Sequence, residues 1–133
     1  LLYRGLNASP RWLVPAAFGD RSKLARDVHR HYLAPFGSWA ERAAPWALGV
    51  ALAGENEHYA ALWERRAMLA KVPLEIAWGM KDPAFGEREL ARFCEAFPEA
   101  NVQRIEEAGH FVAEETPDAL AAIVRHLAAR TSR

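Results

Sequence analysis

The chain has no excess of charge of either sign and almost no cysteine. Its 133 residues include 17 basic and 17 acidic side chains, so the formal net charge is zero. Without a basic excess there is no overall positive field to attract nucleic acid or an anionic membrane, and we expect neither partner. The single cysteine, Cys94, excludes an internal disulfide bond, and a reducing cytoplasm is the default compartment for such a chain.

A long hydrophobic run is also absent. The longest apolar stretch, residues 43–53, is about half of the ~20 residues that span a bilayer, and Pro45 interrupts it. We therefore expect no transmembrane helix. The chain begins with Leu1 rather than methionine, and no signal-peptide pattern follows, so we expect the natural protein to continue upstream. With 51% hydrophobic residues, the chain has enough apolar side chains to bury a core.

The hydropathy pattern changes near Lys71, after which a strand–loop–helix pattern appears twice. The predicted elements are a strand at 74–78, a helix at 87–97, a strand at 102–105 and a helix that Thr116 caps and Pro117 begins. Such spacing implies parallel strands with helices packed on the sheet. We therefore predict an α/β fold for residues 71–133.

The part of the chain before Lys71 has the apolar spacing of helices. The predicted elements are a helix at 22–32 capped by Ser22, a short helix near Trp39, a loose connection around Gly49 and Gly54, and a helix at 57–70.

Two polar side chains follow the predicted strands. Asp82 comes after the first strand, in a turn between Gly79 and Pro83, and His110 comes after the second, behind Gly109. Since adjacent parallel strands end at the same edge of a sheet, we expect the Asp82 carboxylate within hydrogen-bond reach of the imidazole. A carboxylate that orients a histidine forms two members of a nucleophile–His–acid triad. Taken singly, each residue is also an ordinary turn or surface residue.

The third member of such a triad is absent from the sequence. A nucleophile on a strand-to-helix turn is marked by Gly-x-Ser-x-Gly or Gly-x-Asp-x-Gly, and neither pattern occurs in the 133 residues. We therefore expect the nucleophile to lie upstream or in another chain.

Three stretches resemble the α/β-hydrolase superfamily, and within it the haloalkane dehalogenase and epoxide hydrolase branch. They are residues 73–85 (PLEIAWGMKDPAF), 97–100 (FPEA) and 109–117 (GHFVAEETP). The resemblance implies that residues 1–8 are the end of a core strand and the entry to a cap. It likewise implies that residues 9–70 are a helical cap and residues 71–133 the C-terminal part of the hydrolase core.

The resemblance also implies a mechanism for the complete protein. A nucleophilic aspartate would attack the carbon of a small apolar substrate, form an ester and release halide. His110, oriented by Asp82, would then activate the water that hydrolyses this ester. No metal and no organic cofactor are implied. The missing N-terminal half of the core, in the same or another chain, would supply the nucleophile.

Aromatic residues of the expected cap are candidates for substrate contacts. The tryptophans would line an apolar slot, and the tyrosines would protonate an epoxide oxygen, as cap tyrosines do in epoxide hydrolases. These candidates are Trp12, Trp39, Tyr32 and Tyr59. The same residues also suit core packing. Glu114 and Glu115 are expected to form a solvated rim without a role.

Two classes of function remain open. The first is the C-terminal part of a haloalkane dehalogenase-like enzyme, with an epoxide hydrolase or a carboxylesterase of the same fold as alternatives. The second is a non-catalytic remnant or association module. Such a module would bind a partner through its unpaired sheet edge and apolar face, and those surfaces would also allow a homo-oligomer. We expect the 133-residue chain alone to be inactive.

Overall fold

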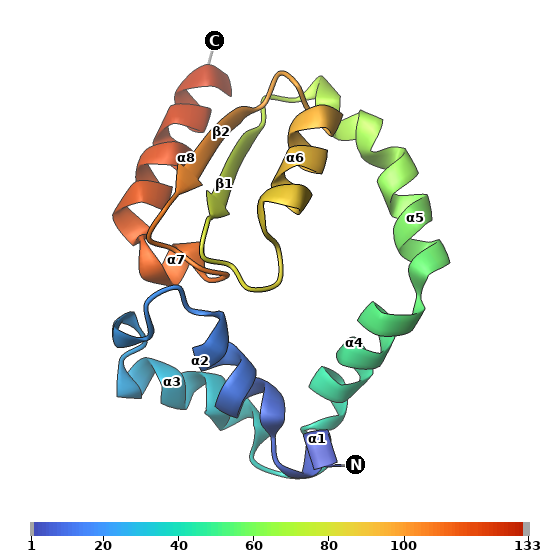
Figure 1. The fold of residues 1–133 in the computed structure, drawn as a ribbon, viewed down its shortest axis with the longest axis vertical. Coiled ribbons are helices and arrows are strands. Elements are labelled where there is room, and N and C mark those ends of the chain that lie inside the picture. The colour runs from blue at the N-terminus through green and yellow to red at the C-terminus, as the bar shows by residue number, and fades with distance from the viewer. Residues whose placement is uncertain (1, 132–133) are drawn as a thin grey trace. The chain divides into compact units, whose positions relative to one another are not determined.

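The computed structural model describes residues 2–131 (Figure 1). These residues divide into two compact units. The first unit holds the residues up to Ala16 together with Leu24–Arg65. The second holds Ala17–Lys23 and the residues from Arg66 onward. The segment Ala17–Lys23 therefore packs with the C-terminal part of the chain, although the division of the sequence assigns it to the expected cap.

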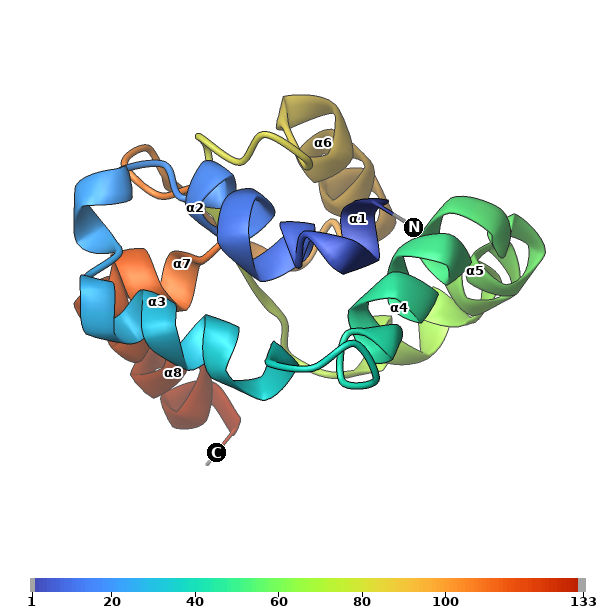
Figure 2. The ribbon, with the colours of Figure 1, turned by 90° about the horizontal axis from the view of Figure 1, so that it is seen from below.

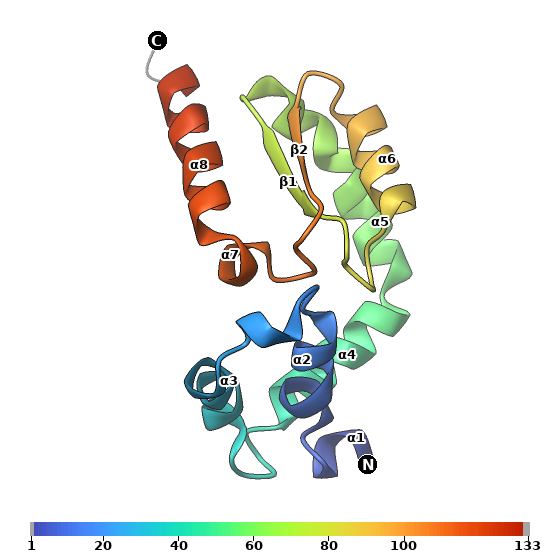
Figure 3. The same cartoon turned by 60° about the vertical axis from the view of Figure 1, so that its left-hand side comes forward.

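The second unit is built on a parallel pair of strands. Strand β1 (Glu75–Gly79) pairs with β2 (Asn101–Ile105), with Glu75 opposite Asn101 and Gly79 opposite Ile105. Helix α6 (Glu87–Ala96) connects the two strands, and α8 (Pro117–Thr131) ends the described chain. Figure 3 shows α6 and α8 on opposite sides of the two strands. The predicted α/β arrangement is confirmed, with each strand beginning or ending one residue from its expected boundary.

Local chemistry explains where α6 begins. The Glu89 carboxylate turns back and accepts the N–H of Gly86 at 3.0 Å, which satisfies one of the free donors of the first turn. The hydrogen bond from Arg88 to the same carboxylate lowers the pKa of Glu89. Leu90, one residue later, is fully buried and anchors the helix.

Thr116 does not act as the predicted cap of α8. Its hydroxyl donates to the carbonyl of Val112 at 3.0 Å, which closes the short helix α7 (Val112–Glu115). Helix α8 still begins at Pro117, because a proline at the first helical position has no N–H that needs a partner.

The buried apolar side chains are concentrated in the second unit. Phe97 at the end of α6 and Ile105 at the end of β2 are 6% and 7% exposed, and Phe18 of the Ala17–Lys23 segment is 5% exposed. The Phe18 ring stacks on that of Phe111 with centroids 5.0 Å apart. The early segment thus contributes to the same core as the strands.

The first unit consists of helices and turns (Figure 2). Its elements are α1 (Leu2–Gly5), a π-helical turn (Ser9–Leu13), α2 (Val14–Ala17), α3 (Arg26–Leu33), a 3-10 turn (Ala34–Phe36), α4 (Ala43–Gly54) and α5 (Asn56–Glu64). Two further 3-10 segments before β1, Arg21–Lys23 and nearly all of Arg65–Lys71, belong to the second unit. The Arg42 guanidinium ties two elements of the first unit together, since it donates to the carbonyls of Gly5 and Phe36 at 2.8 and 3.0 Å.

Predicted boundaries in this helical part are wrong at several positions. Leu2 lies in helix α1 rather than at the end of a strand, and Leu1 lies outside the described residues. Ser22 does not cap a helix, because its N–H and hydroxyl both bind Oδ1 of Asp20, at 2.9 and 2.7 Å, and α3 begins only at Arg26.

The expected loose connection at Gly49 and Gly54 is also wrong, since both glycines lie in α4. This helix begins at Ala43, four residues after Trp39, and its alanine-rich sequence sustains the helix through Gly49. Pro45 is accommodated because it lies in the first turn, where backbone N–H groups have no helical partner.

Helix α4 leaves much of its apolar surface in contact with solvent. Leu48, Val50 and Leu52 are each more than half exposed. Within residues 2–131, no helix combines the length and apolar character that crossing a membrane requires.

Candidate active site

The loop after β1 fixes the Asp82 carboxylate through its own backbone. Oδ1 accepts the N–H groups of Ala84 and Phe85, at 2.8 and 3.2 Å. Pro83 has no N–H, so the carboxylate reaches past it and forms the turn that aspartate favours. With Oδ1 held by the turn, Oδ2 is left for a second partner.

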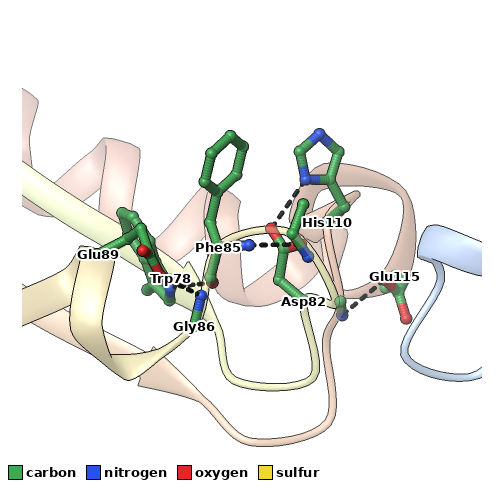
Figure 4. A network of polar contacts seen from close by, with 9 residues as sticks. Trp78, Asp82, Phe85, Gly86, Glu89, His110 and Glu115 are labelled. Carbon is green, nitrogen blue, oxygen red and sulfur yellow. Dashed lines mark hydrogen bonds and ion pairs between the residues drawn. The ribbon is translucent and has the colours of Figure 1, made fainter. Parts of the chain in front are cut away.

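That second partner is His110, in the loop after β2. Nδ1 of the imidazole lies 2.8 Å from Asp82 Oδ2, while the side chains of Asp82 and His110 are 9% and 38% exposed (Figure 4). An ionised carboxylate can only accept, so Nδ1 carries the proton in this contact. Nε2 of a neutral ring is then the nitrogen that can accept a proton. In Figure 4 the ring points its second nitrogen away from Asp82.

The two loops are also bonded to each other along their backbones. Met80 donates its N–H to the carbonyl of Ile105 at 3.0 Å, and Lys81 donates to Ala108 at 2.9 Å. A Cβ at Gly79 would collide with the carbonyl oxygen of Gly109, so only glycine permits this approach. These contacts explain how residues from separate loops meet within hydrogen-bond distance.

Phe85 covers one face of the histidine. Its ring stacks on the imidazole with centroids 5.6 Å apart and planes inclined by 27°, and Phe85 itself is 48% exposed. The indole N–H of Trp78 donates to the Phe85 carbonyl at 2.9 Å, which ties this loop to β1. Phe111 meets the imidazole edge-on, with centroids 5.4 Å apart.

Glu115 is buried and binds the backbone of the histidine loop, so the expectation that it forms a solvated rim is wrong. It is only 4% exposed, and its carboxylate accepts the N–H of Gly109 at 2.8 Å and that of Asp20 at 3.0 Å. Sequence reasoning missed this role because Glu115 stands beside the exposed Glu114, and its partner Asp20 is 95 positions away. No pattern of neighbouring residues predicts the burial of Glu115.

The four aromatic candidates of the sequence belong to the first unit, and Asp82 and His110 belong to the second. Trp12 and Trp39 are 52% and 49% exposed, Tyr59 is 38% exposed and Tyr32 is half-buried. The Trp39 ring already stacks with the Arg4 guanidinium, whose carbon is 4.5 Å from the ring centroid. Substrate contacts by these four residues stay a prediction.

Residues 2–131 contain no group of three or more His, Cys, Asp or Glu side chains that could hold a metal ion. The chemistry that the Asp82–His110 pair itself can perform is proton transfer. Its Nε2 can accept a proton from a neighbouring group, and the Asp82 carboxylate can stabilise the resulting imidazolium.

A carboxylate and an imidazole at the ends of consecutive parallel strands, with helices on both faces, define the C-terminal part of an α/β-hydrolase fold. Comparison with solved structures agrees. A loop variant of a haloalkane dehalogenase from Bradyrhizobium elkanii matches with a TM-score of 0.78 and 22% sequence identity. The match covers 99% of this chain and 46% of the dehalogenase. The resemblance of the sequence to the superfamily is therefore confirmed at the level of the fold.

Curated relatives carry a different name. Two cis-3-alkyl-4-alkyloxetan-2-one decarboxylases, from Shewanella oneidensis and Xanthomonas campestris, are each 28% identical to this chain. The alignments cover 98% and 92% of the chain, but only 42% and 41% of the relatives. The chain thus spans less than half the length of these proteins. No protein-family model matches the sequence.

Proposed function

We propose that Asp82 and His110 are the acid and the base of a nucleophile–His–acid triad in an α/β-hydrolase-fold enzyme. The observation that supports this most directly is the 2.8 Å contact between Asp82 Oδ2 and His110 Nδ1. Asp82 would hold the imidazole in one tautomer and stabilise its charged form, and His110 would move the proton. The nucleophile would come from a segment that these 133 residues do not contain, in the same or another chain.

The preferred substrate is a small apolar lactone of the oxetan-2-one class. This choice rests on the two curated relatives, whose similarity extends over nearly the whole chain. Decarboxylation of such a lactone yields one alkene and one carbon dioxide, so the reaction consumes no water.

A carboxylate nucleophile accounts for this reaction in two balanced steps. Attack at ring carbon 4 breaks the bond to the ring oxygen, joins the enzyme to that carbon and frees the lactone carboxylate. Carbon dioxide then leaves, and the electron pair of the broken carbon–carbon bond forms the alkene and expels the nucleophile. His110, which is neutral with its proton on Nδ1 at rest, would take a proton from solvent on Nε2. In that charged form, which Asp82 stabilises, it would donate a hydrogen bond to the ring oxygen as the first bond breaks.

Hydrolysis of a carbon–halogen bond is the second candidate, because the motif residues and the fold both resemble haloalkane dehalogenases. In that reaction the nucleophile displaces halide, and His110 removes a proton from the water that cleaves the ester. The two candidates therefore differ in whether His110 must activate water.

Direct assay of the protein, supplied with its nucleophile segment, separates these candidates. Turnover of a cis-3,4-dialkyloxetan-2-one is measured as the alkene formed. Turnover of a short 1-haloalkane is measured as the halide released. We expect alkene formation that falls by about 10²–10⁴-fold in His110→Ala. Halide release without alkene formation would favour the dehalogenase instead.

Other outcomes of the assay identify the remaining alternatives. Opening of an epoxide that is lost in Tyr32→Phe or Tyr59→Phe would favour an epoxide hydrolase, and cleavage of a simple ester would favour a carboxylesterase. If none of the four substrates reacts although the nucleophile segment is present, the proposal is wrong and the non-catalytic association module is favoured.

A further inference from the structure

Glu115 is a buried carboxylate whose two oxygens have separate partners. Oε1 accepts the N–H of Gly109 at 2.8 Å, a bond that Figure 4 draws at Glu115. Oε2 accepts the N–H of Asp20 at 3.0 Å. The residue is 4% exposed, whereas the adjacent Glu114 is exposed. A buried carboxylate is tolerated only where hydrogen bonds replace its hydration, and these two bonds do so.

The two N–H groups belong to segments that are far apart in the sequence, 95 and 6 positions from Glu115. Gly109 directly precedes His110, and the N–H of His110 donates to the carbonyl of Ala17 at 2.8 Å. Lys23 donates from Nζ to the backbone carbonyl of Glu115 at 3.0 Å. Both peptide N–H groups next to the imidazole are therefore bound, one by Glu115 and one by the Ala17–Lys23 segment.

The two segments approach each other so closely that a side chain at Gly19 would have no space. A Cβ at Gly19 would lie 2.6 Å from the nitrogen of Gly109 and 2.9 Å from the carbonyl carbon of Ala108. Glu115 binds the same two segments through its carboxylate, so its two bonds act on a closely packed contact.

The geometry of Glu115 requires a carboxylate. Two N–H donors need two acceptor oxygens, and a glutamine would turn its NH₂ group toward one of the donors. An aspartate is one methylene shorter and would not span the two segments. Charged acceptors also form stronger hydrogen bonds to N–H groups than neutral ones do.

We propose that Glu115 is a positioning residue for His110. It bridges Gly109 and Asp20, holds the backbone before the histidine in one conformation, and so keeps Nδ1 in contact with Asp82. The inference rests on the proposed function in taking His110 as the base. It acts through the backbone, since the hydrogen bonds of the Glu115 carboxylate go to backbone N–H groups and not to the imidazole.

The test is a measurement of the imidazole itself, which does not depend on turnover. The protein is labelled with ¹⁵N in its five histidine rings, and the His110 signal is assigned with His110→Gln. In the unsubstituted protein we expect His110 as the Nδ1–H tautomer. In Glu115→Gln we expect this signal to shift toward a mixture of tautomers while those of the other four histidines stay in place.

Glu114→Gln is the matched control, because it removes the same charge from an exposed neighbouring position. It should leave the His110 signal unchanged. An unchanged His110 signal in Glu115→Gln would overturn the proposal. So would equal shifts of all five histidine signals, because a general loss of structure is not a positioning effect.

A second measurement covers the case in which Glu115→Gln fails to fold. In the unsubstituted protein the amide protons of Gly109 and Asp20 should exchange with solvent at least 10²-fold more slowly than the same residues in an unstructured peptide, as roughly expected of bonded amides in stable structure. Rapid exchange of both amides would overturn the proposal without any variant.

Activity provides a third readout where the enzyme turns over. Misplacement of a catalytic group lowers the rate of the chemical step, so Glu115→Gln should lower kcat by about 10²-fold and leave KM near its original value. If the protein proves inactive toward every substrate, the proposed function fails, yet the histidine and amide measurements still decide the role of Glu115.

Discussion

The ring of Phe85 stacks on the imidazole of His110, with centroids 5.6 Å apart and planes inclined by 27°. The contact joins the loop of the candidate acid to the side chain of the candidate base. Since the backbone N–H of Phe85 also donates to Asp82 Oδ1 at 3.2 Å, one residue is in contact with both members of the pair.

Removal of this ring should loosen the histidine. An aromatic pair contributes about 1 kcal/mol, which corresponds to about fivefold in rate. We expect Phe85→Ala to lower kcat by that factor with little change in Tm, because the side chain is half exposed. Phe85→Tyr keeps the ring and should behave as the unsubstituted enzyme. A Phe85→Ala enzyme with undiminished kcat would show that the stack does not orient His110.

Substitution of Asp82 by asparagine should affect catalysis far more than folding. An amide has one acceptor oxygen, so it can serve either the turn at Ala84 and Phe85 or His110, but not both. We expect kcat in Asp82→Asn to fall by about 10²–10⁴-fold. Asp118→Asn, at an exposed position in the first turn of α8, is the control. Equal kcat values for the two variants would contradict the role of Asp82.

Two glycine substitutions should have opposite effects on stability. A Cβ at Gly79 would lie 2.7 Å from the carbonyl oxygen of Ala108 and still closer to that of Gly109, so Gly79→Ala should lower the free energy of unfolding by about 1–3 kcal/mol. Nothing lies within 4 Å of a Cβ at Gly49, in the interior of α4. Gly49→Ala should therefore stabilise the protein by about 0.5–1 kcal/mol. Urea unfolding measures both, and a stable Gly79→Ala protein would mean that the two loops can separate.

The pH dependence of Asp20 follows from its hydrogen bonds. The hydroxyl and the N–H of Ser22 bind its carboxylate and lower the pKa of Asp20 below the ordinary value of 3.8. A lowered pKa in the folded state contributes stability above the ordinary pKa, and this contribution is lost as the pH falls through the folded value. In Ser22→Ala we expect the pKa of Asp20 to rise part of the way back, since the backbone N–H remains.

An NMR titration of the Asp20 carboxyl carbon measures this shift. The difference in stability between Ser22→Ala and the unsubstituted protein should be present at neutral pH and vanish at strongly acidic pH. A difference that persists at acidic pH would show that the hydroxyl stabilises the turn independently of the charge on Asp20.

The acidic residue within β1 should prove necessary for stability. The Glu75 side chain is 3% exposed and binds His126 and Arg130 of α8, at 3.1 and 3.0 Å, as well as Asn101 at 2.7 Å. Hydrogen bonds to a charged group contribute about 1.5–3 kcal/mol, and we expect Glu75→Ala to lower the free energy of unfolding by this amount. Glu87→Ala, which breaks an exposed pair with Arg104, should cost much less. Similar losses in both variants would mean that Glu75 does not attach α8 to the sheet.

The sequence was sufficient where structure depends on neighbours along the chain. The strand β1 ends at a glycine, the helical spacing of apolar residues in α6 places Leu90 inward, and Pro117 begins α8. Because the strands proved parallel, the expectation that Asp82 and His110 meet at one sheet edge also held in the geometry. Glu75 interrupts the apolar sequence of its strand. The structure explains this residue, because its partners His126 and Arg130 lie in α8.

The sequence was insufficient where a side chain depends on distant partners. Serine often caps helices, but the N–H and hydroxyl of Ser22 donate to the Asp20 carboxylate instead. Glutamate is usually a surface residue, and the burial of Glu115 is explained by its hydrogen bonds to Gly109 and to the distant Asp20. The stacking of Phe85 on His110 likewise joins loops from two strands. Periodicity carries no information about such contacts.

The bond between Asp20 and Glu115 also has a consequence for the order of folding. It joins residues 95 positions apart, whereas β1 and β2 pair residues 26 apart at Glu75 and Asn101. The entropy of closing a loop grows with its length, so contacts between distant residues form late. We therefore expect the strand pair and α6 to assemble first. The histidine loop should acquire its final conformation only after Ala17–Lys23 has docked, so catalytic competence would be among the last properties that the folding chain gains.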